Sequence, residues 1–494
     1  MNNANSSSRS AKKTSFADDV LKLVSGTLFA QVLTIIASPF LTRLYGPEAF
    51  GILALFLSVT SIIGVIICFR YELAIMLPET DEEAANLLGL SLVFVVLISV
   101  LTIPIVWLGQ SVILELLKAP KLSRFLWLVP AMVFFSGMAQ ALNYWNSRTK
   151  YFGRLSVARV CQSVTTTGTQ LGSGYIGYAT GGTLIVASVV GSAMSTLILG
   201  GQIWHDDGKF LRTSINWNRM LAGLRRYSKF PIYGIWSALF NTISVQLPVL
   251  MLSNFFPSTV VGYYALSHRL LGLPMSIIGA TFSQVFFQRA AKAKSEGNLV
   301  EVFEVSLQYL LILGIFPFLA LMLVGDDIFT VFLGKNWTEA GVYAQILALW
   351  IFLVFIGSPV QTLIEVLERQ EIELFFNIFL LISRWLSLFI GGLFGNARFT
   401  LILFSVTGVI AWLWMILWLI SNAGLSAKRI TIFLTKKLVF GLPFLIIIVL
   451  AKWVFDLSSL FIVGLYIFSV ITYYFFCFGR DIKSKLKFIL SFKR

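Results

Sequence analysis

Two arginines, Arg269 and Arg384, stand in the middle of long apolar stretches of the sequence. We place no Asp or Glu inside any apolar stretch that is long enough to cross a membrane. A charge at membrane depth costs roughly 3 kcal/mol on insertion scales, so such residues usually face a watery cavity and meet a partner there. Because a guanidinium group stays charged and its fork matches phosphate oxygens, we expect an anionic ligand that carries phosphate or diphosphate.

The composition indicates a membrane protein. The chain has 494 residues, of which 57% are hydrophobic and 12% are charged, and its mean hydropathy is +0.85. These values are far from those of a soluble domain. Apolar windows of about 20 residues, the length that crosses a bilayer core, recur along the whole chain. We predict an all-α polytopic membrane protein with about 14 transmembrane helices, including a fifth span at 155–175 and an eighth at 260–285.

An internal repeat divides these predicted spans. Gly51-Ile-Leu-Ala-Leu opens the second span, and Gly262-Tyr-Tyr-Ala-Leu opens the eighth. A duplication of six spans explains the match, and both copies then cross the membrane in the same direction because six is even. We expect two six-helix parallel-repeat bundles around a central cavity, plus two extra C-terminal helices. The predicted segments are a cytoplasmic tail (1–20), an N-terminal six-helix lobe (21–203), a cytoplasmic basic linker (204–230), a C-terminal six-helix lobe (231–421), two additional transmembrane helices (422–478) and a basic cytoplasmic tail (479–494).

The basic residues predict the orientation. With the N-terminus inside, most of the 38 lysines and arginines fall on the cytoplasmic side of the predicted spans. This bias places both termini in the cytoplasm. The net charge of +15 is then explained by the positive-inside rule and by attraction to anionic membrane lipids, so it does not indicate nucleic-acid binding.

Further polar residues within or beside the spans are candidates for the cavity wall. Arg43, Arg70 and Arg159 are typical of interfacial positions but could extend a basic path for a diphosphate. His268, next to Arg269, could line the cavity or could be packed among other side chains. Amides and hydroxyls can bond sugar hydroxyls, or equally can join neighbouring helices. The candidates for glycan contacts are His268, Gln31, Asn143, Thr165, Thr166, Thr169, Gln170, Asn241 and Gln246.

Metal and catalytic sites are not indicated. The three cysteines have no spacing typical of a disulfide, zinc or haem site, and the chain has two histidines. Glu72 and Glu365 are the acids nearest to the spans, and we expect both to be solvated or interfacial. We therefore predict no cofactor, no metal and no catalytic residue, and a transporter rather than an enzyme. Coupling to H⁺ or Na⁺ stays open.

Two segments near the N-terminus carry a family resemblance. Arg43-Leu-Tyr-Gly-Pro-Glu-Ala-Phe-Gly51 lies between the first two spans, and Arg70-Tyr-Glu-Leu-Ala-Ile follows the second. These segments resemble the start of oligosaccharide flippases of the Wzx type, which export units for polysaccharide biosynthesis. The superfamily also holds multidrug and toxin extrusion carriers. The resemblance in span number, duplication and orientation covers the whole chain.

The resemblance implies a function. Such a protein would translocate undecaprenyl-diphosphate-linked oligosaccharide from the cytoplasmic to the periplasmic leaflet of a bacterial inner membrane by alternating access. The product would serve O-antigen, capsule or exopolysaccharide synthesis, with a polysaccharide polymerase and a chain-length regulator as partners. The related lipid II flippases use cavity arginines for the diphosphate, which Arg269 resembles. We expect the diphosphate toward the C-terminal bundle, where Arg269 and Arg384 lie, and the glycan toward the Thr-rich N-terminal side.

Two other functions compete with this one. An ion-coupled multidrug exporter of the same superfamily typically has an acid in its first span, where this chain has Gln31. A membrane glycan polymerase or ligase would place catalytic residues in a large external loop. The longest external loops that we predict, 110–124 and 326–339, have only about 15 residues, which is ordinary for connections.

Overall fold

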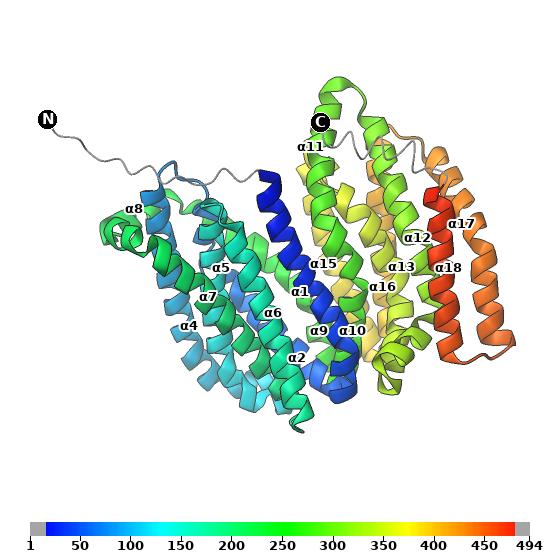
Figure 1. Ribbon diagram of the computed structural model, residues 1–494, viewed down its shortest axis with the longest axis horizontal. Helices are drawn as coiled ribbons and strands as arrows, with labels where there is room; N and C mark the ends of the chain where they lie inside the picture. The colour runs from blue at the N-terminus through cyan, green and yellow to red at the C-terminus, as the bar shows by residue number, and fades with distance from the viewer. Residues whose placement is uncertain (1–15, 480–494) are drawn as a thin grey trace.

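The computed structural model describes residues 16–479, with side chains described from 25 to 477 except at 280 and 281. All regular elements of this part of the chain are helical, which confirms the predicted fold class. The basic tail at 480–494 and most of the N-terminal tail lie outside the described residues. Figure 1 shows α4 to α8 on one side of the molecule and α12, α17 and α18 on the other, with α1, α2, α9, α10 and α15 between them.

The first half of the chain forms six long helices and three short ones. The short elements are α3 (Tyr71–Ala74), the 3-10 segment η1 (Pro120–Leu128) and α8 (Trp217–Arg226). The long helices are α1 (Phe16–Leu44), α2 (Pro47–Ile66), α4 (Asp81–Leu117), α5 (Val129–Arg148), α6 (Phe152–Tyr175) and α7 (Gly181–Ser214).

The second half repeats this order and adds two helices. Short segments interrupt it at η2 (Phe230–Gly234), η3 (Met275–Gly279), η4 (Lys335–Trp337), η5 (Ser358–Val360), α14 (Leu363–Val366) and η6 (Leu450–Val454). The main helices are α9 (Ile235–Phe255), α10 (Ser258–Leu271), α11 (Ala280–Glu296), α12 (Leu299–Leu333), α13 (Thr338–Gly357), α15 (Gln370–Leu393), α16 (Ala397–Asn422), α17 (Ala427–Val449) and α18 (Ser459–Gly479).

Helix packing in the two halves follows one pattern. In the first half α1 packs on α6, α6 on α7, α4 on α5 and α5 on α7. In the second half α9 packs on α15, α15 on α16, α12 on α13 and α13 on α16. These are the same contacts if α1 corresponds to α9 and the later helices follow in order. The lobe boundaries proposed from the sequence stay a prediction, but the pairing of contacts is what a duplication produces.

The two motifs of the repeat meet face to face. A Cβ atom placed on Gly51 would lie 1.8 Å from the backbone oxygen of Ser258, and one on Gly262 would lie 1.9 Å from that of Pro47. The backbone of one helix can approach that of the other this closely because Gly51 and Gly262 have no side chain at the contact. The glycines that identify the repeat are therefore also the contact between α2 and α10, where equivalent residues of the two halves touch.

Twelve helical segments of the described chain are long and apolar enough to cross a membrane, so the predicted number of fourteen is not confirmed. The two that do not qualify are the predicted fifth and eighth spans. The fifth is α6, which is rich in Thr and Gly and packs between α1 and α7. The eighth is divided into α10, η3 and α11, because the helix changes to a π-helical segment at Met275–Gly279.

The external connections differ from the prediction. Helix α4 continues to Leu117 and α12 to Leu333, so most of the two predicted external loops is helical. Asp326 and Asp327 therefore belong to a membrane helix, and the expectation that no span contains an acid is wrong. The Lys452 ammonium lies 2.5 Å from Asp326 and 2.7 Å from Asp327, so these acids neutralise a lysine of η6 rather than either arginine.

Candidate functional site

Arg269 lies in the last turn of α10. Its side chain is exposed, although many protein atoms lie around the residue. Within the described part of the chain, no hydrogen bond or ion pair involves its guanidinium group. Arg269 is therefore a cation without a protein partner among the described residues, and its role as an anion-binding residue stays a prediction.

Arg384 of α15 has protein partners instead. Its Nη1 donates to the backbone oxygen of Ser244 at 3.3 Å and to the Ser244 hydroxyl at 3.0 Å. Its guanidinium carbon lies 5.9 Å from the ring centre of Trp350, in the range of a cation–π contact. These contacts join α15 to α9 and α13. Part of the hydrogen-bonding capacity of Arg384 is therefore already used by the protein.

His268 is part of an aromatic cluster. Its ring lies 5.6 Å from that of Tyr264 and 5.9 Å from that of Trp350. Phe404 closes the cluster, with its ring 4.8 Å from Trp350. Of the two roles left open for His268, this packing favours the structural one. Because neighbouring helix residues point about 100° apart, His268 can face this cluster while Arg269 faces water.

A polar cavity of about 490 Å³ lies between α5, α6 and α7 in the first half. It brings together Asn143 and Arg159, two residues singled out in the sequence. Arg159 also donates a hydrogen bond to the Thr27 hydroxyl of α1 at 2.5 Å. The cavity wall is dominated by groups that can bond sugar hydroxyls, namely Ser136, Gln140, Asn143, Tyr144, Ser147, Gln162 and Ser195. Sequence inspection missed most of this wall, because amides and hydroxyls in helices are also common helix–helix contacts.

Arg70 and Arg43 lie apart from Arg269. Arg70 follows α2, and its Nη1 lies 3.6 Å from the carboxylate of Glu72. Glu72 has no exposed surface, so the expectation that it is solvated or interfacial is wrong. The reason is that α3 packs against α4, α5 and η2, and Gln140 of α5 donates to the carboxylate at 3.0 Å. Arg43 is exposed at the opposite end of the membrane-spanning region and bonds the Pro39 carbonyl of its own helix.

The remaining glycan candidates divide into two groups. Four have structural contacts. The Gln246 side chain accepts from Ser58, the buried Gln170 accepts from Tyr45 through its carbonyl, and the Thr166 hydroxyl occupies the space beside Gly191. Thr169 accepts from Ser173, also through its carbonyl. Gln31, Thr165 and Asn241 are partly or fully exposed, and no side-chain hydrogen bond of theirs occurs within the described residues.

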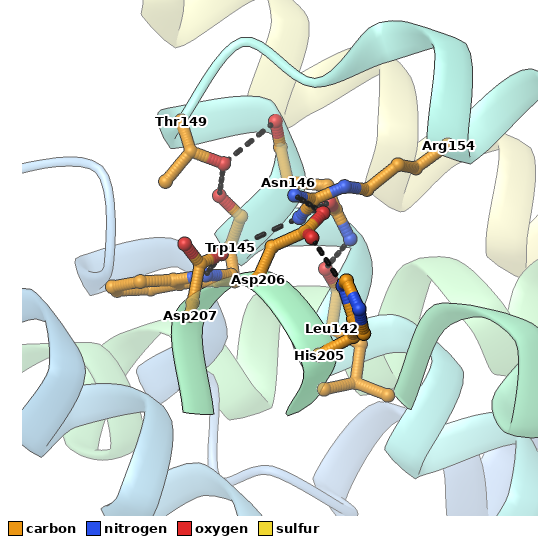
Figure 2. A network of polar contacts seen from close by, with 8 residues as sticks. All are labelled: Leu142, Trp145, Asn146, Thr149, Arg154, His205, Asp206 and Asp207. Carbon is orange, nitrogen blue, oxygen red and sulfur yellow. Dashed lines mark hydrogen bonds and ion pairs between the residues drawn. The ribbon is translucent and has the colours of Figure 1, made fainter. Parts of the chain in front are cut away.

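A charged network where α5, α6 and α7 meet was not anticipated. Figure 2 shows Arg154 between Asp206 and Asp207, at 2.5 Å and 3.3 Å. Arg154 also donates to Asn146 at 3.2 Å, and the Trp145 indole donates to Asp207 at 3.3 Å. The network fastens α5, α6 and α7 together. The sequence contains the charges, but their pairing depends on helix packing that no spacing reveals.

Known structures share this fold. Lipid II flippase MurJ in an inward closed conformation matches with a TM-score of 0.73 and 14% identity, covering 94% of this chain and 100% of that one. An inward-facing multidrug resistance MATE family transporter of the MOP superfamily matches with a TM-score of 0.64 and 14% identity, covering 80% of this chain and 94% of that one. At such low identity these similarities establish the fold alone.

Sequence comparison adds a relative and a family. Lipopolysaccharide biosynthesis protein WzxC of Escherichia coli (strain K12) is 24% identical over 200 residues, which are 40% of this chain and 39% of the relative. A family model described as Polysaccharide biosynthesis protein matches residues 40–342, more than half of the chain. The match includes both repeat motifs, Arg269 and the polar cavity. The chain therefore belongs to the polysaccharide biosynthesis protein family.

Proposed function

We propose that the chain is a flippase that moves oligosaccharide units linked to undecaprenyl diphosphate from the cytoplasmic to the periplasmic leaflet. The observation that carries this proposal is Arg269, a cation whose side chain is exposed although many protein atoms lie around it, and which has no partner within the described residues. A diphosphate supplies the missing negative charge, and its oxygens match the guanidinium fork. The family membership supports a substrate from polysaccharide biosynthesis.

The two halves of the site then have different roles. In the second half Arg269 binds the diphosphate, and the Tyr264–His268–Trp350 cluster supports its helix from behind. In the first half the cavity between α5, α6 and α7 offers amides and hydroxyls to the glycan. Arg159 adds a cation to that cavity, so positive charge is present on both sides. The lipid chain remains in the bilayer, which lies directly beside the transmembrane helices.

Transport follows the alternating-access scheme in this proposal. The lobes 21–203 and 231–421 rock about the contact between Gly51 and Gly262, where the two backbones touch. Both termini face the cytoplasm of a bacterial inner membrane, as the distribution of basic residues indicates. The exported unit would next meet a polymerase and a chain-length regulator for O-antigen, capsule or exopolysaccharide synthesis.

Deletion of the gene tests this function. The expected result is accumulation of lipid-linked glycan in the cytoplasmic leaflet and loss of surface polysaccharide, both restored by the wild-type gene. Purified protein in vesicles should then move the lipid-linked glycan between leaflets. Unchanged surface polysaccharide with a new sensitivity to cationic drugs would contradict the proposal and favour a multidrug exporter. Accumulation of single units on the outer leaflet would instead indicate a polymerase or ligase.

A further inference from the structure

Glu72 is a buried carboxylate that the proposed transport site does not use. It has no exposed surface, and it lies in α3, between the membrane-spanning helices α2 and α4. One carboxylate oxygen accepts from Gln140 at 3.0 Å and lies 3.6 Å from Arg70. The other oxygen is buried and has no hydrogen-bond partner within the described residues. A buried charge with half of its acceptors unused is costly, and protonation removes that cost.

The charges around Glu72 are few. Arg70 precedes it on the same connection, and Cys68 and Tyr144 are the neighbouring titratable groups. From the helices packed on α3, Asp81 of α4 and Arg148 of α5 bond to each other at 3.0 Å, and η2 contains no charged residue. Burial raises the pKa of Glu72, whereas its backbone hydrogen bond, Arg70 and Gln140 oppose that shift. Glu72 can therefore change its charge without a compensating change nearby.

Arg70 connects this pair to the other half of the molecule. Phe69 and Arg70 both adopt left-handed backbone angles, with φ of 50° and 63°, which side-chain-bearing residues rarely do without a structural reason. Beside Arg70 lies Gly234, the last residue of η2 before α9, where an added Cβ would be 3.8 Å from the Arg70 side chain. Tyr71, which follows Arg70 in the chain, donates to the carbonyl of Leu224 at 3.0 Å. The Glu72–Arg70 pair thus holds the connection that touches the start of the second half.

Gln140 connects the same pair to the polar cavity. Its amide donates to Glu72, and its side chain lines the cavity together with Arg159. The Glu72 carboxylate is therefore linked to two places. Gln140 links it to the cavity of the first half, and Arg70 links it to the boundary with the second half. Proton binding can be coupled to a change of conformation when one titratable group joins two parts of the structure, as Glu72 does.

We propose that Glu72 is the proton-binding site that couples a proton gradient to transport, an inference that rests on the proposed flippase function. A proton from water adds to the carboxylate and forms a neutral carboxylic acid, and the ion pair with Arg70 opens while Arg70 keeps its charge. The Gln140 amide continues to donate to the acid. Without its anion, Arg70 no longer holds the left-handed connection against Gly234, and the contact between the halves at the cytoplasmic end is released. Loss of the proton restores the pair.

The first test does not need a substrate. Thermal unfolding of the purified protein is compared for wild type, Glu72→Gln and the control Glu79→Gln, an exposed glutamate on the same connection, from about pH 5 to about pH 8. Because burial favours the neutral acid, Glu72 stabilises the fold at low pH, and its contribution declines as the pH rises through the raised pKa. The Tm difference between wild type and Glu72→Gln should therefore change with pH, and that between wild type and Glu79→Gln should not. A constant difference for both variants would overturn the proposal.

The second test uses transport in vesicles that contain the lipid-linked glycan. An imposed proton gradient should accelerate transport by wild type and by Glu79→Gln, and should not accelerate transport by Glu72→Gln. A rate that follows a sodium gradient and ignores pH would overturn the proton site. Failure of the wild type to move the glycan under any gradient would instead contradict the flippase function, while a pH-dependent Tm difference would still support the proton site. Should Glu72→Gln not accumulate, Glu72→Asp replaces it, and an unchanged pH midpoint would count against the proposal.

Discussion

The two halves of the chain share one packing pattern but treat their buried charges differently. In the first half Arg159, Arg70 and Arg154 all bond to protein groups, and the cavity between α5, α6 and α7 is walled by neutral polar side chains. In the second half Arg269 has no partner among the described residues. The neighbouring His268 packs against the rings of Tyr264 and Trp350. Duplication therefore preserved the scaffold while the polar residues diverged. The half that leaves a cation unpaired is the half we expect to hold the anion.

The strongest test of this difference removes the unpaired cation. Arg269→Ala should lower flipping by about a hundredfold or more, because loss of one member of a buried charge pair costs about 2–5 kcal/mol. Arg269→Lys should retain part of the rate, since charge is kept but the fork is lost. Vesicle transport measures both rates. Arg225→Ala, which removes an exposed arginine from α8, is the matched control. Equal rates for Arg269→Ala and the control would remove the main support for the diphosphate site.

Arg384 in the same half should respond differently. Because its guanidinium bonds Ser244, Arg384→Ala should destabilise the protein by about 1.5–3 kcal/mol, the range for hydrogen bonds to charged groups. Thermal unfolding of Arg384→Ala, Ser244→Ala and the double variant forms a double-mutant cycle, and the two effects should not add. A large loss of transport with unchanged Tm would show that Arg384 binds substrate as Arg269 does.

The sequence alone predicted more of the scaffold than of the site. Helices and the repeat follow from apolar windows and from the paired motifs at Gly51 and Gly262, which are local patterns. The partners of Arg384 and Glu72 could not be predicted, because Ser244 and Gln140 are far away in the chain and reach them only through helix packing. The span at 260–285 is not confirmed for a related reason. Hydropathy does not reveal that the backbone changes to a π-helical segment at Met275–Gly279.

The contact between the halves can be tested from both sides. Gly51→Ala and Gly262→Ala each insert a methyl group where backbone atoms of the other half already lie, at 1.8 Å and 1.9 Å. Each should cost about 1–3 kcal/mol, the usual penalty for overpacking, and the two costs should be similar because the residues are equivalent. Thermal unfolding measures them, with Gly64→Ala as control, since a Cβ there meets no atom within 4 Å. Markedly unequal costs would argue against a shared pivot.

The smallest expected effect belongs to the cation of the first half. Arg159 bonds Thr27 and lines the polar cavity, so its charge is already partly satisfied without a ligand. We expect Arg159→Gln to lower flipping by about tenfold, equivalent to about 1.4 kcal/mol and well below the effect of Arg269→Ala. The comparison is sharpest with two substrates, the intact lipid-linked glycan and the lipid diphosphate with a single sugar. If the cavity serves the glycan, Arg159→Gln should slow the long substrate more than the short one, whereas Arg269→Ala should slow both equally. If Arg159→Gln instead slowed both substrates equally and Arg269→Ala slowed mainly the long one, the diphosphate would bind in the first half. The arginines discussed there already bond to protein groups, so the unpaired charge of Arg269 would then need another explanation.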